Sequence, residues 1–150
     1  MELRERLNGD MRFAYRHFPS GLRNSISQKA AEAAEAAGAQ GKFWEMHRLL
    51  FDHANSLSDA TIGLCAASAG LNMRRFFGDV KSGAYAWRVR EDFESGLKSG
   101  VNSVPTFYIN GVRHDDYWDA ETLLAAMERD PWQTNEHVGI TDSLRTVLAY

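Results

Sequence analysis

The sequence has 150 residues, a formal net charge of −3 and a single cysteine, which together exclude several classes of protein. A chain of this length fits one domain, so we expect residues 1–150 to form a single domain. Nucleic-acid binding needs clustered lysines and arginines, and the basic residues here are scattered, so we expect no nucleic-acid partner. No apolar run reaches the roughly 20 residues of a membrane helix, and no apolar signal-peptide core follows Met1. We therefore expect a cytoplasmic protein without a membrane partner.

The first predicted elements are the end of a helix and a strand. Leu3 and Leu7 lie four residues apart on one helix face, and Asn8-Gly9 is a helix stop signal. In the next segment, MRFAYRHF, one face would carry Met11, Phe13 and Tyr15, and the other would carry Arg12, Ala14 and Arg16. This period of two residues predicts a strand.

A block of helices, about residues 25–100, follows the strand. A polar residue opens and a glycine closes most of the predicted helices, and the predicted N-caps are Ser27, Ser58 or Asp59, and Asn72. In the last helix of the block an apolar residue recurs every four positions from Tyr85 to Leu97, which predicts its buried face. The acidic residues of this helix, Glu91, Asp92 and Glu94, are interpreted as its solvated face.

The last third of the sequence predicts a hairpin and a closing helix. Thr106–Ile109 and Val112–His114 flank Asn110-Gly111, the dipeptide most typical of a tight hairpin turn. Asp119 is the predicted cap of the closing helix, and the final segment TDSLRTVLAY is predicted as one more short helix. Strand, helices, hairpin and helix in this order predict an α/β fold in which helices cover a small mixed sheet.

Four segments of the sequence carry a family resemblance. They are RFAYRHFP, AAEAAGAQGKFWEMHRLLF, VREDFESGLKSGVNSVPTFYINGVRH and the helix after the last of these. In this order they resemble the DsbA-like branch of the thioredoxin superfamily. Within that branch, the sequence most resembles the bacterial group that is found alone or fused to transporters. The resemblance covers about residues 3–130.

The resemblance implies a thioredoxin-like fold of DsbA type with a helical insertion. In that family a first strand leads to a Cys-x-x-Cys motif, and a loop with a cis-proline precedes the hairpin. Pro105 matches the cis-proline, and Val104 matches the residue whose backbone pairs with a bound peptide or thiol substrate. Val104, Pro105 and Thr106 are therefore the expected substrate-binding residues.

The sequence departs from the family in lacking the first strand and the Cys-x-x-Cys motif. Thiol–disulfide exchange needs an attacking thiolate and a resolving cysteine, so we expect no catalytic residues here. Cys65 lies in the middle of a predicted helix, at a position typical of a packed cysteine. The histidines, among them His17, which we interpret as structural, show no metal-binding spacing, so neither a metal nor another cofactor is expected.

Three functional hypotheses remain open. The chain is a redox-silent DsbA-like domain that retains peptide binding at the proline loop, or a fragment of a longer active thiol–disulfide oxidoreductase. The third hypothesis is a glutathione-dependent transferase or isomerase of the related branch. Whether the chain is an enzyme is therefore undecided by its sequence.

The missing first strand has a structural consequence. In thioredoxin folds that strand lies between the second strand and the hairpin, and buried unpaired backbone groups cost roughly 1–3 kcal/mol each. Either MRFAYRHF pairs directly with TFYI, or two copies of the chain join their open sheet edges. We favour the second arrangement and expect a homodimer.

Overall fold

Two groups of elements are present in the computed structural model, which describes residues 11–21, 25–117, 119–128 and 145–149. The helical unit comprises His17–Lys98, and the sheet unit comprises residues 1–16 and 99–150. Each unit is described separately below. The predicted helix end before residue 11 lies outside the described residues.

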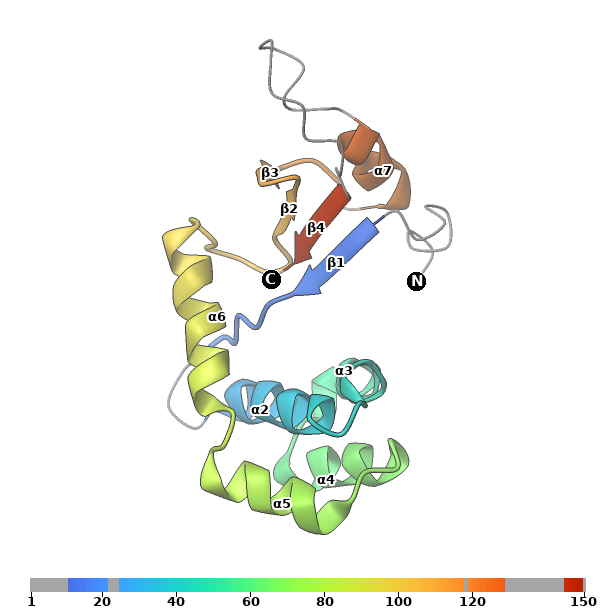
Figure 1. Cartoon of the computed structure of the whole chain (residues 1–150), viewed down its shortest axis with the longest axis vertical. Coiled ribbons are helices and arrows are strands. Elements are labelled where there is room, and N and C mark those ends of the chain that lie inside the picture. Colours follow the sequence, from blue (N-terminus) through green and yellow to red (C-terminus); the bar gives the residue numbers. More distant parts are fainter. Residues whose placement is uncertain (1–10, 22–24, 118, 129–144, 150) are drawn as a thin grey trace. The chain divides into compact units, whose positions relative to one another are not determined.

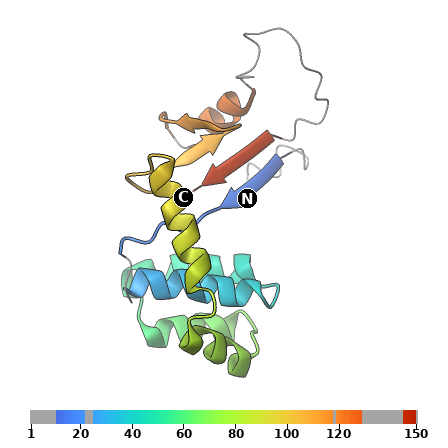
Figure 2. The same ribbon diagram turned by 60° about the vertical axis from the view of Figure 1, so that its left-hand side comes forward.

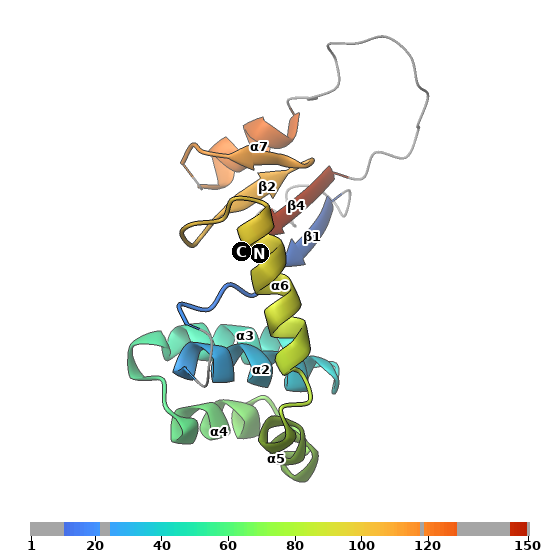
Figure 3. The same cartoon turned by 90° about the vertical axis from the view of Figure 1, so that its left-hand side faces the viewer.

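The helical unit is built around α2 (Ile26–Gly38), with α3 (Phe43–Asp52), the short 3-10 helix η1 (Ala54–Ser56), α4 (Asp59–Ser68), α5 (Met73–Ser82) and α6 (Ala86–Lys98) following in chain order (Figure 1). Alanine has the highest helix propensity and the smallest side chain that still fills space, so α2 forms readily and lets its neighbours approach closely. Its buried residues are all alanines, at positions 30, 31, 33, 34, 36 and 37. Helices α3, α4, α5 and α6 all contact α2, and α4 and α5 together cover one side of it (Figure 3).

Larger side chains complete the core around the alanine face. Phe76 of α5 is 1% exposed, and Met46 of α3 is fully buried. Cys65 of α4 is 2% exposed and belongs to the same cluster, which confirms its predicted packing position.

Side-chain caps begin α2, α4 and α5, largely as predicted. The side chain of Ser58 accepts a hydrogen bond from the Thr61 N–H, and that of Asn72 accepts one from the Arg75 N–H. The cap of α2 was predicted at Ser27, and this is wrong, because Ser25 accepts the bond from the Gln28 N–H. The Ser27 hydroxyl instead contacts the Ser25 hydroxyl at 3.1 Å. No described helix is both long enough and apolar enough to cross a bilayer.

The sheet unit contains four described strands, β1 (Met11–Tyr15), β2 (Phe107–Ile109), β3 (Val112–His114) and β4 (Arg145–Ala149), in the order β1-β4-β2-β3. The predicted hairpin is confirmed, since β2 and β3 pair in antiparallel fashion with Phe107 opposite His114. Asn110 and Gly111 both have positive φ, as a tight hairpin turn requires. Helix α7 (Ala120–Glu128) begins at the predicted cap Asp119 and packs on β2.

A small apolar cluster joins α7 to the hairpin. Ile109 of β2 is 4% exposed, and Leu123 and Met127 of α7 are 3% and 2% exposed. Phe107 and Ala126 are partly buried against them. This cluster holds the hairpin against α7.

The strand β4 occupies the centre of the sheet (Figure 2). It runs parallel to β1, with Met11 opposite Arg145 and Tyr15 opposite Ala149. It runs antiparallel to β2, with Phe107 opposite Ala149. In the thioredoxin arrangement that the resemblance implied, this is the position of the missing first strand.

Two sequence predictions about this region are therefore wrong. The segment Arg145–Ala149 was predicted within a short helix, but it forms a strand. β1 and β2 were also predicted as candidates for direct pairing, but each pairs with β4 instead. The physical reason is that β4, inserted between β1 and β2, pairs with the facing edges of both strands. Direct pairing of β1 with β2 would have left the backbone groups of β4 without these partners.

Candidate functional site

The loop from Val101 to Thr106 carries the three residues predicted to bind substrate. Val101 and Thr106 are 3% and 5% exposed, so both ends of the loop are buried. The residues between them are exposed, and the side chain of Val104 projects into solvent with 56% of its surface accessible. The peptide bond between Val104 and Pro105 is cis. The loop thus presents a short exposed backbone segment between two buried anchors.

Side-chain hydrogen bonds fix the shape of this loop from within and from the hairpin. The Thr106 hydroxyl donates to the Ser103 carbonyl oxygen at 2.6 Å, which closes the exposed turn. Arg113 of β3 donates through Nη1 to the Gly100 carbonyl oxygen at 2.7 Å and through Nη2 to the Asn102 Oδ1 at 3.4 Å. The Tyr108 hydroxyl donates to the Ser99 carbonyl oxygen.

Arg113 is itself held in place by a neighbouring carboxylate. Its Nε lies 2.7 Å from Asp115 Oδ1, and its side chain is 34% exposed. The guanidinium therefore joins three groups with its planar fork of donors, an arrangement that a lysine ammonium does not reproduce. The sequence predictions named the loop but did not identify Arg113, because nothing in its spacing links it to residues 100 and 102.

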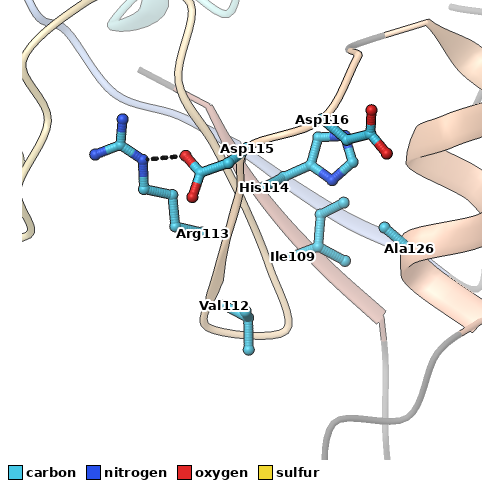
Figure 4. Close-up of a pocket in the computed structure, with 7 residues that line it drawn as sticks. All are labelled: Ile109, Val112, Arg113, His114, Asp115, Asp116 and Ala126. Atoms are coloured by element: carbon cyan, nitrogen blue, oxygen red, sulfur yellow. Dashed lines mark hydrogen bonds and ion pairs between the residues drawn. The ribbon is translucent and has the colours of Figure 1, made fainter.

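A pocket lies beside the hairpin, between β3 and α7 (Figure 4). Its volume is about 460 Å³, and Ile109, Ala126 and Val112 form its apolar surface. His114 lies on its polar side, and its Nε2–H donates to the Tyr117 carbonyl oxygen at 2.8 Å. Arg113, which holds the loop through the Gly100 carbonyl oxygen, also lines this pocket.

A cluster of charged groups lies in the helical unit. His17 and Asp92 are 4% and 1% exposed, and the His17 N–H donates to Asp92 Oδ2 at 3.1 Å. The His17 Nε2–H donates to Glu35 Oε1 at 3.0 Å, and Arg88 Nε lies 2.9 Å from Glu35 Oε2. The interpretation of Asp92 as part of a solvated face is therefore wrong, because the buried His17 backbone needs an acceptor at this position.

The ligand atoms of His17, Glu35 and Asp92 lie within 4.8 Å of one another, close enough for a metal site. Glu35 Oε2 already faces the Arg88 guanidinium, and Asp92 Oδ2 already accepts from the His17 N–H. The cationic guanidinium would repel a divalent cation bound beside it. We therefore interpret the cluster as a charge network that fixes the segment around His17 to α2 and α6, in line with the structural role predicted for His17.

The same network sets the acidity of Glu35. Burial alone would raise the pKa of this carboxyl group, but the hydrogen bond from His17 and the positive charges of His17 and Arg88 outweigh burial and lower it. A carboxyl group with a lowered pKa stabilises the folded state above its ordinary pKa of 4.5, and this stabilisation is lost as the pH falls below that value.

His47 lies in a row of aromatic side chains on α3. Its ring stacks on Phe43 with centroids 5.8 Å apart and contacts Phe51 at 4.6 Å. Burial, and to a smaller extent the positive charge of His17, lower the pKa of His47 from 6.5 to about 4. This ring is therefore neutral in the folded protein at physiological pH.

We expect the stability of the helical unit to fall as the pH drops from about 6.5 to about 4, because the unfolded chain protonates His47 and the folded chain does not. After allowance for solvent screening of this partly exposed ring, the loss should be about 1 kcal/mol. Urea unfolding of the wild type and of His47→Gln at pH 7 and pH 5 measures it. An unchanged pH dependence in His47→Gln would show that another group is responsible.

The sheet order, the loop before β2 and the helix on the hairpin together define a thioredoxin-like fold. The sequence profile of the Thioredoxin family matches residues 2–129, and the chain belongs to this family.

Three relatives illustrate the similarity to known proteins, and all three are called Na(+)/H(+) antiporters. The NhaA 1 protein of Mycolicibacterium vanbaalenii is 38% identical over 129 residues, which are 85% of this chain and 21% of that protein. NhaA 1 of Mycobacterium sp. strain KMS is 40% identical with the same coverage, and NhaA of Herminiimonas arsenicoxydans is 35% identical over 85% of this chain and 20% of that protein. The chain thus spans about a fifth of the length of the curated relatives it matches. No solved structure matches the chain significantly.

Proposed function

We propose that the chain is a DsbA-type thioredoxin domain that binds extended peptide segments at Val104–Thr106 and has no thiol–disulfide exchange activity of its own. The observation that carries this proposal is the exposed backbone around Val104, held between the buried residues Val101 and Thr106. Exposed backbone groups in a fixed geometry bind an extended peptide by adding main-chain hydrogen bonds. A protein substrate that carries a thiol can bind in the same way, because the contact is made through its backbone.

The loop is suited to binding because little of it has to become ordered when a peptide arrives. Arg113, Thr106 and Tyr108 already hold its backbone through side-chain hydrogen bonds. Preorganisation of this kind raises affinity by removing part of the entropy cost of binding.

The redox-silent part of the proposal rests on Cys65, the single cysteine in the sequence. Its side chain is 2% exposed, and burial together with the negative charge of Asp52 raises the pKa of its thiol. Exchange with a disulfide needs an accessible thiolate and a second thiol to resolve the mixed disulfide. Cys65 supplies neither.

The proposal is tested with a peptide that cannot take part in exchange. Fluorescein-labelled, S-alkylated insulin B chain should bind the wild type saturably. Val104→Pro, which removes the backbone N–H of residue 104, should weaken binding at least about tenfold, the equivalent of one strong hydrogen bond. Val104→Thr keeps the backbone and nearly the side-chain shape, so its affinity should stay within about threefold. Equal affinities for all three proteins would refute backbone pairing at Val104.

The alternative functions have their own readouts. Reduction of insulin by dithiothreitol should not accelerate on addition of the chain, and acceleration would overturn redox silence. An in-frame upstream strand ending in Cys-Pro-x-Cys would instead make the chain part of an active oxidoreductase. Retention on a glutathione column would favour the transferase or isomerase.

The names of the relatives do not extend the proposal to ion transport. The profile of the Thioredoxin family covers residues 2–129, and the similarity to the antiporters extends over 129 of the 150 residues, so the two matches share most of the chain. We therefore propose that the similarity reflects a thioredoxin domain within those longer proteins.

Arg113 is the residue whose substitution should weaken peptide binding without changing a loop residue. Arg113→Met removes the hydrogen bonds to the Gly100 carbonyl and the Asn102 side chain, and we expect a 3- to 10-fold loss of affinity. The affinity of Arg113→Lys should lie between those of the wild type and Arg113→Met, because one ammonium group does not bridge both acceptors. The B-chain titration measures both variants, and Arg48→Met, in an exposed pair on α3, is the control. Wild-type affinity in Arg113→Met would contradict this role.

Cys65 should react slowly with thiol reagents in the folded protein. We expect native labelling by an aromatic disulfide reagent to be at least about 100-fold slower than labelling in guanidinium, because the thiol is buried and its pKa is raised. The absorbance of the aromatic thiolate released by the reagent measures the labelling rate in the native chain and in guanidinium. Rapid, stoichiometric labelling of the native chain would place Cys65 at the surface.

A further inference from the structure

The central strand of the sheet is contributed by the last described segment of the chain. β4 fills the slot between β1 and β2, pairing Met11–Tyr15 on one side and Phe107–Ile109 on the other. Without it, two facing rows of backbone donors and acceptors would be open, and an open row of this kind is a template for any extended segment.

The slot specifies the direction and register of its occupant through backbone pairing. An occupant runs parallel to β1 and antiparallel to β2, and its last residue lies opposite Phe107. Main-chain hydrogen bonds do not depend on which copy of the chain supplies the strand.

The sequence does not join β4 to either of its neighbouring strands through a short loop. Its neighbours β1 and β2 are far from it in sequence, and residues 129–144 separate it from the end of α7. A segment of that length can span at most about 55 Å. We propose that the slot between β1 and β2 is a strand-acceptor site whose second occupant is β4 of another copy, which yields a reciprocally strand-exchanged dimer.

The exchange would bring the second copy to the candidate binding loop. Ala149, the end of β4, lies opposite Phe107, two residues after Pro105. In the exchanged dimer each loop is therefore flanked by the strand end of the other copy. This proposal replaces the joining of open sheet edges as the route to the expected homodimer, and it does not depend on peptide binding at the loop.

The balance between the two states is set by concentration. The same strand pairs form in the monomer and in the exchanged dimer. The difference in free energy between them therefore comes from the covalent connection, residues 129–144, that keeps β4 near its own slot. The connection is 16 residues long (129–144), and a short linker gives an effective concentration of about 1 mM. We therefore expect almost only monomer at about 10 µM and comparable amounts of monomer and dimer near 1 mM.

The test uses the full chain with Cys65→Ala as background. Ala14 and Leu148 are register partners on β1 and β4, and directly paired positions lie within disulfide distance. Chains carrying only Ala14→Cys are mixed with chains carrying only Leu148→Cys near 1 mM, left to exchange, and oxidised. We expect a disulfide-linked heterodimer at 1 mM and almost none at 10 µM.

Two controls make the result decisive. The double variant Ala14→Cys, Leu148→Cys should form a disulfide within one chain at 10 µM, which verifies the register. Arg12→Cys pairs with Thr146 rather than Leu148, so its mixture with Leu148→Cys should not cross-link. Formation of the internal disulfide without any heterodimer at 1 mM would overturn the exchange, and failure of both would overturn the slot itself. Sedimentation of the unmodified chain at both concentrations gives the same answer without a cysteine, since a chain that stays monomeric at 1 mM contradicts the proposal.

Discussion

Replacement of Glu35 by alanine is expected to lower the free energy of unfolding of the helical unit by about 2–4 kcal/mol. The change leaves the Arg88 guanidinium and the buried His17 ring without their shared acceptor, and removal of one member of a buried pair costs about 3–5 kcal/mol. The value is placed lower because Arg88 is 45% exposed and water can partly replace the lost carboxylate. Urea unfolding followed by far-UV circular dichroism measures the difference.

The charge and the hydrogen bond of Glu35 can be separated. Glu35→Gln keeps an oxygen that accepts from His17 but loses the negative charge, so it should lose less stability than Glu35→Ala. It should also flatten the fall in stability below pH 4.5, because the lowered pKa of Glu35 contributes to that fall. Asp52→Ala, in an exposed pair with Arg48, is the matched control and should change stability by less than about 0.5 kcal/mol. Equal effects of Glu35→Ala and Asp52→Ala would mean that the network is energetically unimportant.

Replacement of Phe76 by alanine is expected to have the second large effect, about 3–5 kcal/mol. The ring is 1% exposed in the main apolar cluster of the helical unit, and its removal combines lost burial with an unfilled cavity. Thermal and urea unfolding at pH 7 measure the loss. Phe76 shares its apolar cluster with the buried alanines of α2, which have no flexible side chains to move into the space.

The adjacent residue provides the control for this prediction. Phe77 has the same side chain on the same helix but is 52% exposed, and Phe77→Ala should cost about 1 kcal/mol or less. A similar loss for the two variants would contradict the burial that distinguishes them. Because the two positions have nearly the same helix context, helix propensity cancels in the comparison.

The features that sequence predicted well are those that depend on neighbours in the chain. The hairpin turn at Asn110-Gly111 and the cap at Asn72 each follow from a few adjacent residues. The packing of Cys65 follows from its apolar neighbours at helical spacing. The predicted cap at Ser27 differs from the observed one by only two residues, because Ser25 and Ser27 flank the first residue of α2.

The features that sequence missed depend on partners far away in the chain. Asp92 looks like part of a charged helix face, and only its hydrogen bond to His17, 75 residues earlier, explains its burial. Arg113 reaches back to the loop carbonyl of Gly100, which no periodicity indicates. The β4 segment takes its strand conformation from two strands remote in sequence, so local pattern alone favoured a helix.

The position of β4 also has a consequence during protein synthesis. Translation proceeds from the N-terminus at about 5–20 residues per second, and units fold as they leave the ribosome. The helical unit ends at Lys98 and can fold while the remaining residues are still being added. The sheet unit receives its central strand from Arg145–Ala149, so its sheet closes only when the nascent chain has emerged to these residues.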